Sequence, residues 1–154
     1  MRGTDKTIKN VACRENPPCL PPTATVSQAI ELMCDQGCHG VLVMDQNQLV
    51  GIFTERDLLY RVAAPGLTSA STVLGDVMSR DPVALSEDAT ISYAINHMGF
   101  HGFSHVPILD HSGTPVALLD IRDVTGHLSG VFDDLASRPR FDAVASPWVD
   151  IGGG

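Results

Sequence analysis

The chain has 154 residues, of which 44% are hydrophobic and 18% charged, a balance typical of a folded globular protein rather than a disordered one. Its formal net charge is −8 and only 5% of its residues are aromatic, so we expect no binding of nucleic acid through phosphate neutralisation or base stacking. No apolar run is long enough to cross a membrane, and the N-terminus lacks the apolar block of a signal peptide. We therefore expect a cytoplasmic protein without membrane insertion.

An internal repeat organises the chain, with a shift of 65 residues from Thr25 to Thr90. Laying residues 7–45 on residues 72–110 without gaps gives 12 identities in 39 columns, where unrelated segments would share about two or three. Because the matches include Pro, Gly and Asp, a shared pattern of apolar helix positions does not explain them. The sequence therefore predicts a duplication. We expect repeats at 7–63 and 72–128, a linker at 64–71 and a C-terminal tail at 129–154.

The first repeat reads as β-α-β-β-α. Thr25 is a suitable N-cap for a helix whose apolar residues recur at i, i+3, i+4 and i+7, and Gly37 is suited to end that helix. The predicted elements are a short strand at 19–20, this helix, strands at 40–44 and 49–53 joined by a tight turn at 45–48, and a helix from 55 towards 63.

The second repeat has the same order. It predicts an extended piece at 83–85, a helix at 90–98, strands at 106–109 and 116–119 around a turn at 110–113, and a helix from 121. Beyond it, residues 130–136 predict a short amphipathic turn. Trp148 lies in the tail, where it either docks on a partner or on the folded repeats, or belongs to an unstructured extension.

These elements predict an α+β fold. A sheet of about three short strands with two helices buries too little apolar surface to be stable alone, so we expect the two repeats to pack face to face with pseudo-twofold symmetry. Such packing leaves clefts along the shared interface, where ligands commonly bind.

The run GIFTERDLL, residues 51–59, combines the end of a strand with the start of a helix. After Gly51 and Ile52, the pair Thr54 and Asp57 has the spacing of a capping box. The same pair also suits a ligand. A hydroxyl beside free N–H groups at a helix N-terminus fits a phosphate oxygen, and an ionised carboxylate accepts two hydrogen bonds from a ribose diol. Both interpretations stay open on spacing alone.

The chain thus has two β-α-β-β-α units. The last strand of each unit ends in Gly or Ala, two apolar residues, and Thr or Asp, and a further Asp follows three residues later. This pattern resembles a tandem pair of CBS domains, or Bateman module. The resemblance covers residues 7–128 and includes a second family-like segment, SHVPILD at 104–110. It implies a non-catalytic regulatory module that binds an adenosine-containing ligand such as AMP, ADP, ATP, NAD or S-adenosylmethionine. The motif Asp would meet the ribose hydroxyls and the Thr or Ser the phosphate. The resemblance also implies a homodimer, and we expect a separate, unidentified effector protein.

The second copy of the motif departs from this pattern, because Asp120 stands where the first copy has Thr54. Asp123 keeps the ribose-facing carboxylate, but Asp120 would place a negative charge near a phosphate, at a cost on the order of a few kcal/mol. We therefore expect two unequal clefts. The cleft of Thr54 and Asp57 is the better nucleotide site, whereas that of Asp120 and Asp123 is empty, takes a ligand without phosphate there, or needs Mg²⁺.

Four basic side chains accompany the two motifs. Arg56 and Arg122 each precede the motif Asp, and they either contact phosphate or are exposed residues of the first helical turn. His105 immediately precedes the strand at 106–109, and His39 is at the neighbouring column of the first repeat. Each histidine either faces phosphate or is a solvated or core imidazole.

Three alternatives compete with a nucleotide sensor. Cys13, Cys19, Cys34 and Cys38 with His39 suggest a metal or redox site, although their spacing lacks the tight pairs of structural zinc sites and small-residue packing explains them as well. An enzyme is not expected, because no nucleophile-and-base motif occurs. The third alternative is a structural dimerisation module with vestigial clefts. Tight nucleotide binding that is lost in an Asp57→Ala variant would exclude this alternative.

Overall fold

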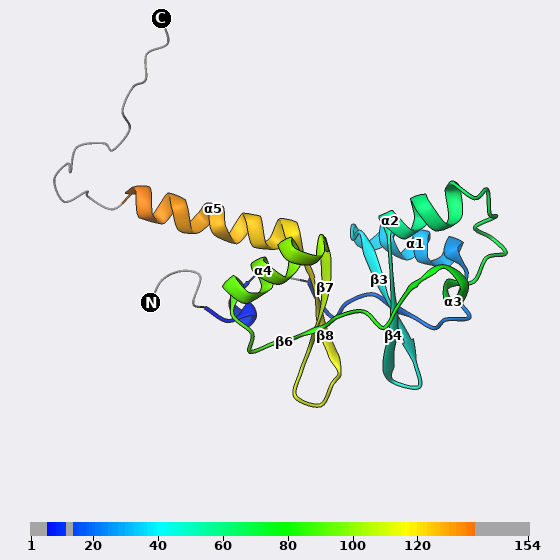
Figure 1. Ribbon diagram of the computed structural model, residues 1–154, viewed down its shortest axis with the longest axis horizontal. Helices are drawn as coiled ribbons and strands as arrows, with labels where there is room; N and C mark the ends of the chain where they lie inside the picture. The colour runs from blue at the N-terminus through cyan, green and yellow to red at the C-terminus, as the bar shows by residue number, and fades with distance from the viewer. Residues whose placement is uncertain (1–5, 12–13, 138–154) are drawn as a thin grey trace, which may run out of the picture.

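The computed structural model describes residues 6–11 and 14–137 (Figure 1). The tail from 138 onwards, with Trp148, and Cys13 lie outside these residues. In the first half, the elements are η2 (Ile8–Asn10), β1 (Arg14–Glu15), β2 (Cys19–Leu20), α1 (Val26–Gln36), β3 (Gly40–Asp45), β4 (Gln48–Thr54), α2 (Glu55–Asp57) and η3 (Leu58–Ala63). In the second half they are α3 (Leu74–Val77), β5 (Ser79–Arg80), β6 (Leu85–Ser86), α4 (Ile91–His101), β7 (His105–Leu109), β8 (Pro115–Asp120) and α5 (Ile121–Ser137).

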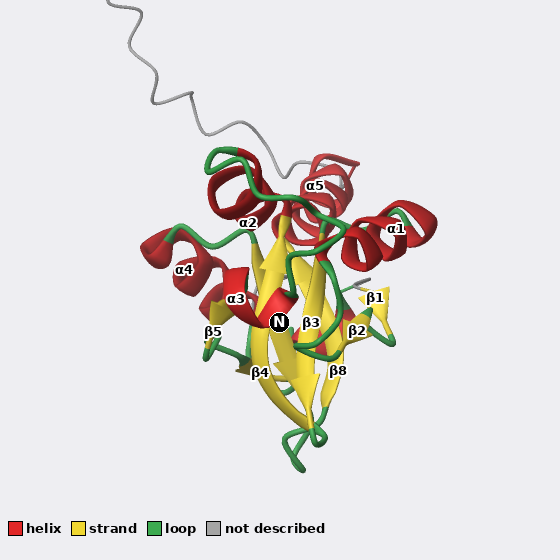
Figure 2. Ribbon diagram, turned by 90° about the vertical axis from the view of Figure 1, so that its right-hand side faces the viewer, coloured by secondary structure: helices red, strands yellow, loops and turns green. Residues whose placement is uncertain are grey.

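The strands form two four-stranded sheets. One has the order β2-β3-β4-β5 and the other the order β1-β8-β7-β6. The hairpins β3–β4 and β7–β8 stand side by side with their turns at the same end (Figure 1), and the longer helices lie toward the opposite end of the sheets (Figure 2). The predicted α+β fold of two β-α-β-β-α repeats packed with pseudo-twofold symmetry is confirmed.

The predicted caps at Thr25 and Gly37 are confirmed, and Thr90, predicted as the first residue of its helix, is the equivalent N-cap in the second repeat. Thr25 accepts a hydrogen bond from the Gln28 N–H at 3.3 Å, and Thr90 accepts one from the Tyr93 N–H at 3.2 Å. Each helix then ends at a glycine with a positive φ. Only glycine adopts this left-handed conformation without a steric cost, so the glycine in each repeat stops its helix at the same place.

The predicted tight turn at 45–48 is confirmed, and one other expectation about local structure was wrong. Asp45 pairs with Gln48, and the two central residues of the turn, Gln46 and Asn47, have φ of 47° and 64°. Positive φ at both residues defines the two-residue turn that matches strand twist. Residues 130–136 form no separate turn, because α5 continues through them to Ser137.

The two repeats exchange their leading segments. Ile8 is buried in the core of the second repeat, where its N–H donates to the Ala89 carbonyl at 2.9 Å, and β1 pairs with β8. In the same way, Leu74 is buried in the core of the first repeat, where its N–H donates to the Ala24 carbonyl at 2.8 Å, and β5 pairs with β4. Each packing unit therefore takes one segment from the other sequence repeat.

A third, smaller cluster joins the two halves. Leu42 and Ile52 from the first sheet pack with Leu118 from the second. The sheets thus face each other through these apolar residues, and this contact fixes how the ends of β4 and β8 are placed relative to one another.

Candidate functional site

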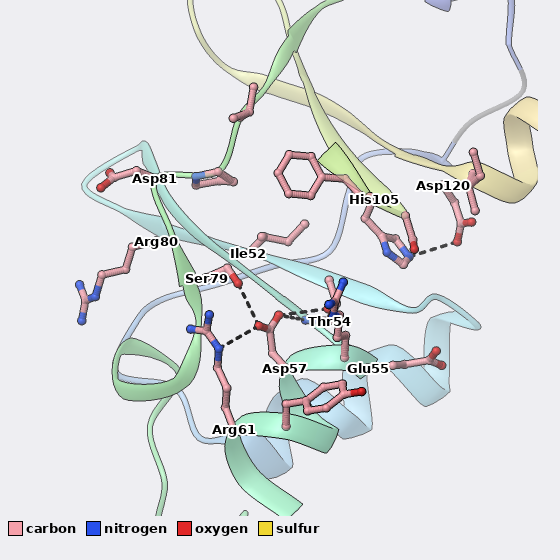
Figure 3. Close-up of a pocket in the computed structure, with 18 of the residues that line it drawn as sticks. Ile52, Thr54, Glu55, Asp57, Arg61, Ser79, Arg80, Asp81, His105 and Asp120 are labelled. Carbon is pink, nitrogen blue, oxygen red and sulfur yellow. Dashed lines mark hydrogen bonds and ion pairs between the residues drawn. The ribbon is translucent and has the colours of Figure 1, made fainter. Parts of the chain in front are cut away.

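A cavity of about 790 Å³ lies between the two repeats (Figure 3). One wall comes from the end of β4, from α2 and η3, and from β5 with the turn after it. The opposite wall comes from the loop after α4, the start of β7, the end of β8 and the start of α5. The first wall consists of Ile52, Thr54, Glu55, Arg56, Asp57, Tyr60, Arg61, Ser79, Arg80, Asp81, Pro82 and Val83. The second consists of Gly102, Phe103, Ser104, His105, Asp120, Ile121 and Arg122.

Asp57 is the buried acid of this cavity, with 7% of its surface exposed. Its Oδ2 accepts hydrogen bonds from the Thr54 N–H at 2.9 Å and the Thr54 hydroxyl at 3.0 Å. Its Oδ1 accepts one from the Ser79 hydroxyl at 2.9 Å and lies 3.4 Å from Nε of Arg61 (Figure 3). The carboxylate therefore closes the first helical turn and also joins α2 to β5.

The helix that follows Asp57 has an unusual geometry. Residues 58–63 form a π-helix, η3, a rare form that is frequently found at functional sites. Arg61, within η3, pairs with Asp57 and donates to the Met78 carbonyl at 2.7 Å. The Arg56 guanidinium lies 5.9 Å from the centre of the Tyr60 ring. These contacts place two arginines and an aromatic ring at one wall of the cavity.

On the opposite wall, Asp120 is paired within its own repeat. The Arg122 side chain donates to both of its carboxylate oxygens, at 2.6 and 3.0 Å, and Nε2 of His105 lies 3.2 Å from its Oδ2. Burial raises the pKa of Asp120, but the hydrogen bonds from Arg122 and the charge of His105 outweigh burial and hold that pKa below its usual value. Asp120 thus has a cationic partner inside the chain.

The pairing of Asp120 with Arg122 removes the reason for expecting Mg²⁺ at this carboxylate. A guanidinium already supplies the positive charge that we expected Asp120 to need near a phosphate. No group of three or more metal-ligating side chains occurs in residues 6–11 and 14–137. Magnesium at Asp120 stays a prediction without support from this geometry.

His105 is mostly buried beside this pair, and burial is the main cause that lowers its pKa below 6.5. The charges of Arg122 from α5 and His39 from the loop before β3 act in the same direction, whereas Asp120 from β8 opposes them. The folded protein therefore binds a proton at His105 less readily than the unfolded chain does. The stabilising contribution is complete above about pH 6.5 and is lost as the pH falls from there through the lowered pKa.

We accordingly expect wild-type protein to lose more free energy of unfolding than a His105→Gln variant between about pH 7.5 and pH 5.5. Urea unfolding at the two pH values measures the difference. His111→Gln is the matched control, because His111 is an exposed histidine outside the cavity. Equal pH dependence in wild type and His105→Gln would show that His105 is not the titrating group.

The structure brings most of the predicted site residues together. Seven of them line this one cavity: Ile52, Thr54, Arg56, Asp57, His105, Asp120 and Arg122. Thr54 and Asp120, which we expected to belong to separate clefts, both line this cavity, whereas Asp123 does not. The expectation of two unequal nucleotide sites stays a prediction. The pseudo-twofold packing brings the ends of β4 and β8 to opposite walls of the same space.

Three predicted site residues are placed next to the cavity instead. Gly51 is required by packing, because a Cβ there would lie 2.3 Å from the sulfur of Met78. His39 pairs with Glu55, with 2.5 Å between Nδ1 and Oε1. Asp123 accepts a hydrogen bond from the Asp120 N–H at 3.0 Å, the same capping contact that Asp57 makes with Thr54.

Sequence reasoning missed the contribution of residues 79–83. They belong to the exchanged segment, so their place in the first repeat's half of the cavity is not evident from chain order. One signal was present in the sequence: Asp81 and its repeat counterpart Asn16 each precede a proline. In the structure these two residues have positive φ, of 46° and 53°. An Asn or Asp before Pro at matching positions marks a repeated turn.

The cysteine alternative gains no support from the described residues. Cys19 and Cys34 are exposed free thiols and Cys38 is half-buried. Although the residue is exposed, partial burial of its thiol raises the pKa of Cys19, which lowers its thiolate fraction and hence its reactivity. A site that includes Cys13 lies outside the described residues.

Among the helices that the structure describes, none is both long and apolar enough to cross a membrane. The fold and the cavity together define a class of protein: a duplicated module with a cavity between its halves. The chain belongs to the CBS domain family, whose model matches residues 8–64 and 74–130.

The relatives agree with this family. The chain is 32% identical over 125 residues to a CBS domain-containing protein of Arabidopsis thaliana, CBSCBSPB3, covering 77% of this chain and 22% of that protein. It is 31% identical over 121 residues to an uncharacterised 17.7 kDa protein of Acidianus ambivalens, covering 78% of this chain and 72% of that one. The chain thus spans about a fifth of the plant relative's length.

Solved structures share the fold. CBSX2 in complex with AMP matches with a TM-score of 0.68 and 24% identity, over 82% of this chain and 98% of that one. The CBS domain pair of protein MJ0100, in complex with 5′-methylthioadenosine and S-adenosylmethionine, matches with a TM-score of 0.72 and 18% identity, over 81% of this chain and 97% of that one.

Proposed function

We propose that this CBS pair is a non-catalytic sensor that binds an adenosine-containing ligand, with AMP, ADP or ATP as the first candidates, in the cavity between its repeats. One observation carries the proposal. The carboxylate of Asp57 and the hydroxyl of Thr54 line a cavity that is large enough for a nucleotide and has walls from both repeats. Two solved CBS pairs that share the fold hold AMP or S-adenosylmethionine and 5′-methylthioadenosine, which supports the same ligand class here.

The chemistry of the walls suggests how the ligand is held. Ile52, Pro82 and Val83 supply apolar surface for the flat base. Asp57 accepts hydrogen bonds from the ribose hydroxyls, and the Thr54 hydroxyl donates to a phosphate oxygen. Arg56 and Arg122, from opposite walls, supply positive charge for the anionic end.

A bound ligand would replace some of the hydrogen bonds that Asp57 accepts in the free protein. Asp57 holds Ser79 of β5 at 2.9 Å, and ribose hydroxyls that bind the same carboxylate compete with that contact. Because β5 leads into the second repeat, occupancy would favour one arrangement of the two repeats over another. We propose that this change is read by an effector protein, in a homodimeric and cytoplasmic sensor of cellular energy state.

A ligand screen tests the proposal. Thermal unfolding of the full chain is followed with AMP, ADP, ATP, NAD and S-adenosylmethionine, and each hit is then titrated by calorimetry. A ligand at 100 times its Kd stabilises the fold by about 2.7 kcal/mol, which gives a clear rise in Tm. If none of the five raises Tm, the sensor proposal fails and a structural dimerisation module becomes the better interpretation.

We expect Asp120→Asn to strengthen binding of an anionic nucleotide about tenfold, because it removes a negative charge from the cavity and frees Arg122 and His105 for the phosphate. Calorimetric titration with AMP measures the gain, which should shrink at high salt. Asp110→Asn is the control, since this acid in the turn after β7 lies outside the cavity lining. Unchanged or weaker AMP affinity in Asp120→Asn would place the phosphate elsewhere.

A further inference from the structure

Two histidines on α4, His97 and His101, lie outside the lining of the proposed nucleotide cavity, and the proposed function does not use them. They are four residues apart, so one turn of the helix places both side chains on the same face. The centres of their rings are 4.6 Å apart. Both residues line an open groove of about 710 Å³ on α4, which lies at the periphery of the molecule (Figure 2). The pair can therefore be reached from solvent through this groove.

His97 carries a buried nitrogen that no other group satisfies. Its Nε2 is buried and has no hydrogen-bond partner among the residues that the structure describes. A polar atom left in this way costs about 1–3 kcal/mol, and a bound ion is one of the explanations for such an atom in a native fold. The equivalent position of the first repeat is Leu32, which packs partly buried against the core of that repeat. The fold accepts an apolar side chain here, so packing does not require the imidazole.

The separation of the two rings fits a metal ion shared between them. A metal bound through an imidazole nitrogen lies about 2.0–2.1 Å from that nitrogen, and hence about 3.2 Å from the ring centre. Two rings that bind one ion at an angle of about 90–110° therefore have centres roughly 4.5–5.2 Å apart. The observed separation of His97 and His101 is within this range. Two histidines at this helical spacing are also the arrangement by which helical zinc motifs bind their metal.

The surroundings of the pair favour a cation. Residues 91–101 contain no Lys or Arg, and the whole chain has a net charge of −8, so no cation on α4 repels the ion and the field of the chain attracts it. The Phe103 ring stacks on His101 with the ring centres 5.3 Å apart, and its centre lies 6.0 Å from that of His97. Such an apolar neighbour restricts the positions of the imidazoles and limits the access of water to them.

We propose that His97 and His101 form a surface site for a divalent transition-metal ion that prefers imidazole, namely Ni²⁺, Cu²⁺ or Zn²⁺. Neutral imidazole is a common ligand for these ions, whereas Mg²⁺ and Ca²⁺ prefer oxygen ligands. The chain supplies two nitrogens and water supplies the remaining ligands, because the described residues contain no group of three or more metal-ligating side chains. The ion gives Nε2 of His97 the partner that it otherwise lacks.

Calorimetric titration of the untagged full chain with NiCl₂ tests this site, without nucleotide, so that its failure leaves the proposed function untouched. We expect one ion per chain at the α4 histidines. His97→Leu and His101→Gln, which introduce the residues that α1 carries at these positions, should each weaken Ni²⁺ binding at least tenfold. His111→Gln is the matched control, because His111 is an exposed histidine in the turn between β7 and β8, and its affinity for Ni²⁺ should equal that of wild type.

A second readout assigns the ion to these two rings. Ni²⁺ with water ligands is paramagnetic, so the NMR signals of the His97 and His101 rings should broaden when it is added, and the ring signals of His111 should not. His101 is exposed, so His101→Gln decides the question if His97→Leu does not fold. MgCl₂ should give no binding that either α4 variant removes. Wild-type affinity for Ni²⁺ in the α4 variants would overturn the proposal, as would a wild type that binds no Ni²⁺ or broadening confined to other histidines.

Discussion

Replacing Asp57 with asparagine is expected to weaken adenosine-nucleotide binding about 30- to 100-fold. The variant keeps the size of the side chain but removes the charge that strengthens its hydrogen bonds, and bonds to a charged group are worth about 1.5–3 kcal/mol. The amide NH₂ also cannot accept from the ribose, from Ser79 or from Arg61, so one half of the side chain would face only donors. Calorimetric titration with the best ligand of the screen measures the loss.

Asp123→Asn is the control for this variant. Asp123 makes the equivalent capping contact in the second repeat, with the Asp120 N–H, but it does not line the cavity. Both variants should lose about 1 kcal/mol of capping energy. Asp57→Asn should in addition weaken the contacts with Ser79 and Arg61, and only this variant should lose ligand affinity. Equal affinities in the two variants would show that the ribose does not bind Asp57, and the proposed pose would be wrong.

Leu74→Ala is expected to lower the free energy of unfolding by about 2–5 kcal/mol, the usual range for truncation of a fully buried leucine. Leu74 lies after the linker in the chain, yet it is completely buried in the core of the first repeat. The loss should therefore appear as destabilisation of the whole chain rather than of the second repeat alone. Urea unfolding followed by circular dichroism measures it.

Leu67→Ala is the matched control, because Leu67 is 46% exposed in the linker and should change stability by less than about 0.5 kcal/mol. The same exchange of segments predicts that neither half of a chain cut within residues 64–71 is stable on its own. The cut would remove Ile8 from the core of the second repeat, and it would remove Leu74 from the core of the first repeat. A small effect of Leu74→Ala, comparable to that of Leu67→Ala, would contradict the exchange.

Local signals in the sequence predicted most of the architecture. The repeated helix with its Thr cap and Gly end, and the paired strands of each hairpin, depend on residues within a few positions of one another. Such signals are readable in a single chain because capping, turn formation and amphipathic periodicity are short-range effects. The extent of α5 was not predicted, since residues 130–136 were expected to form a short amphipathic turn and instead continue the helix to Ser137.

The candidate site was predicted in part for the same reason. Thr54 and Asp57 are three residues apart, so their contact follows from the geometry of one helical turn. Ser79, which donates a hydrogen bond to Asp57 from β5, lies 22 residues further along the chain. No local pattern announces that contact.

By itself, the sequence determined the duplication, the β-α-β-β-α order of each repeat and the pair of motifs that end β4 and β8. Only the tertiary structure decided that the leading segments are exchanged, that Asp120 pairs with Arg122 beside His105, and that Thr54 and Asp120 line the same cavity. The physical reason is range. Caps and periodicity act between neighbours, whereas the burial of Ile8 and Leu74 and the contact of Leu42 and Ile52 with Leu118 are free-energy gains that exist only when distant segments pack together.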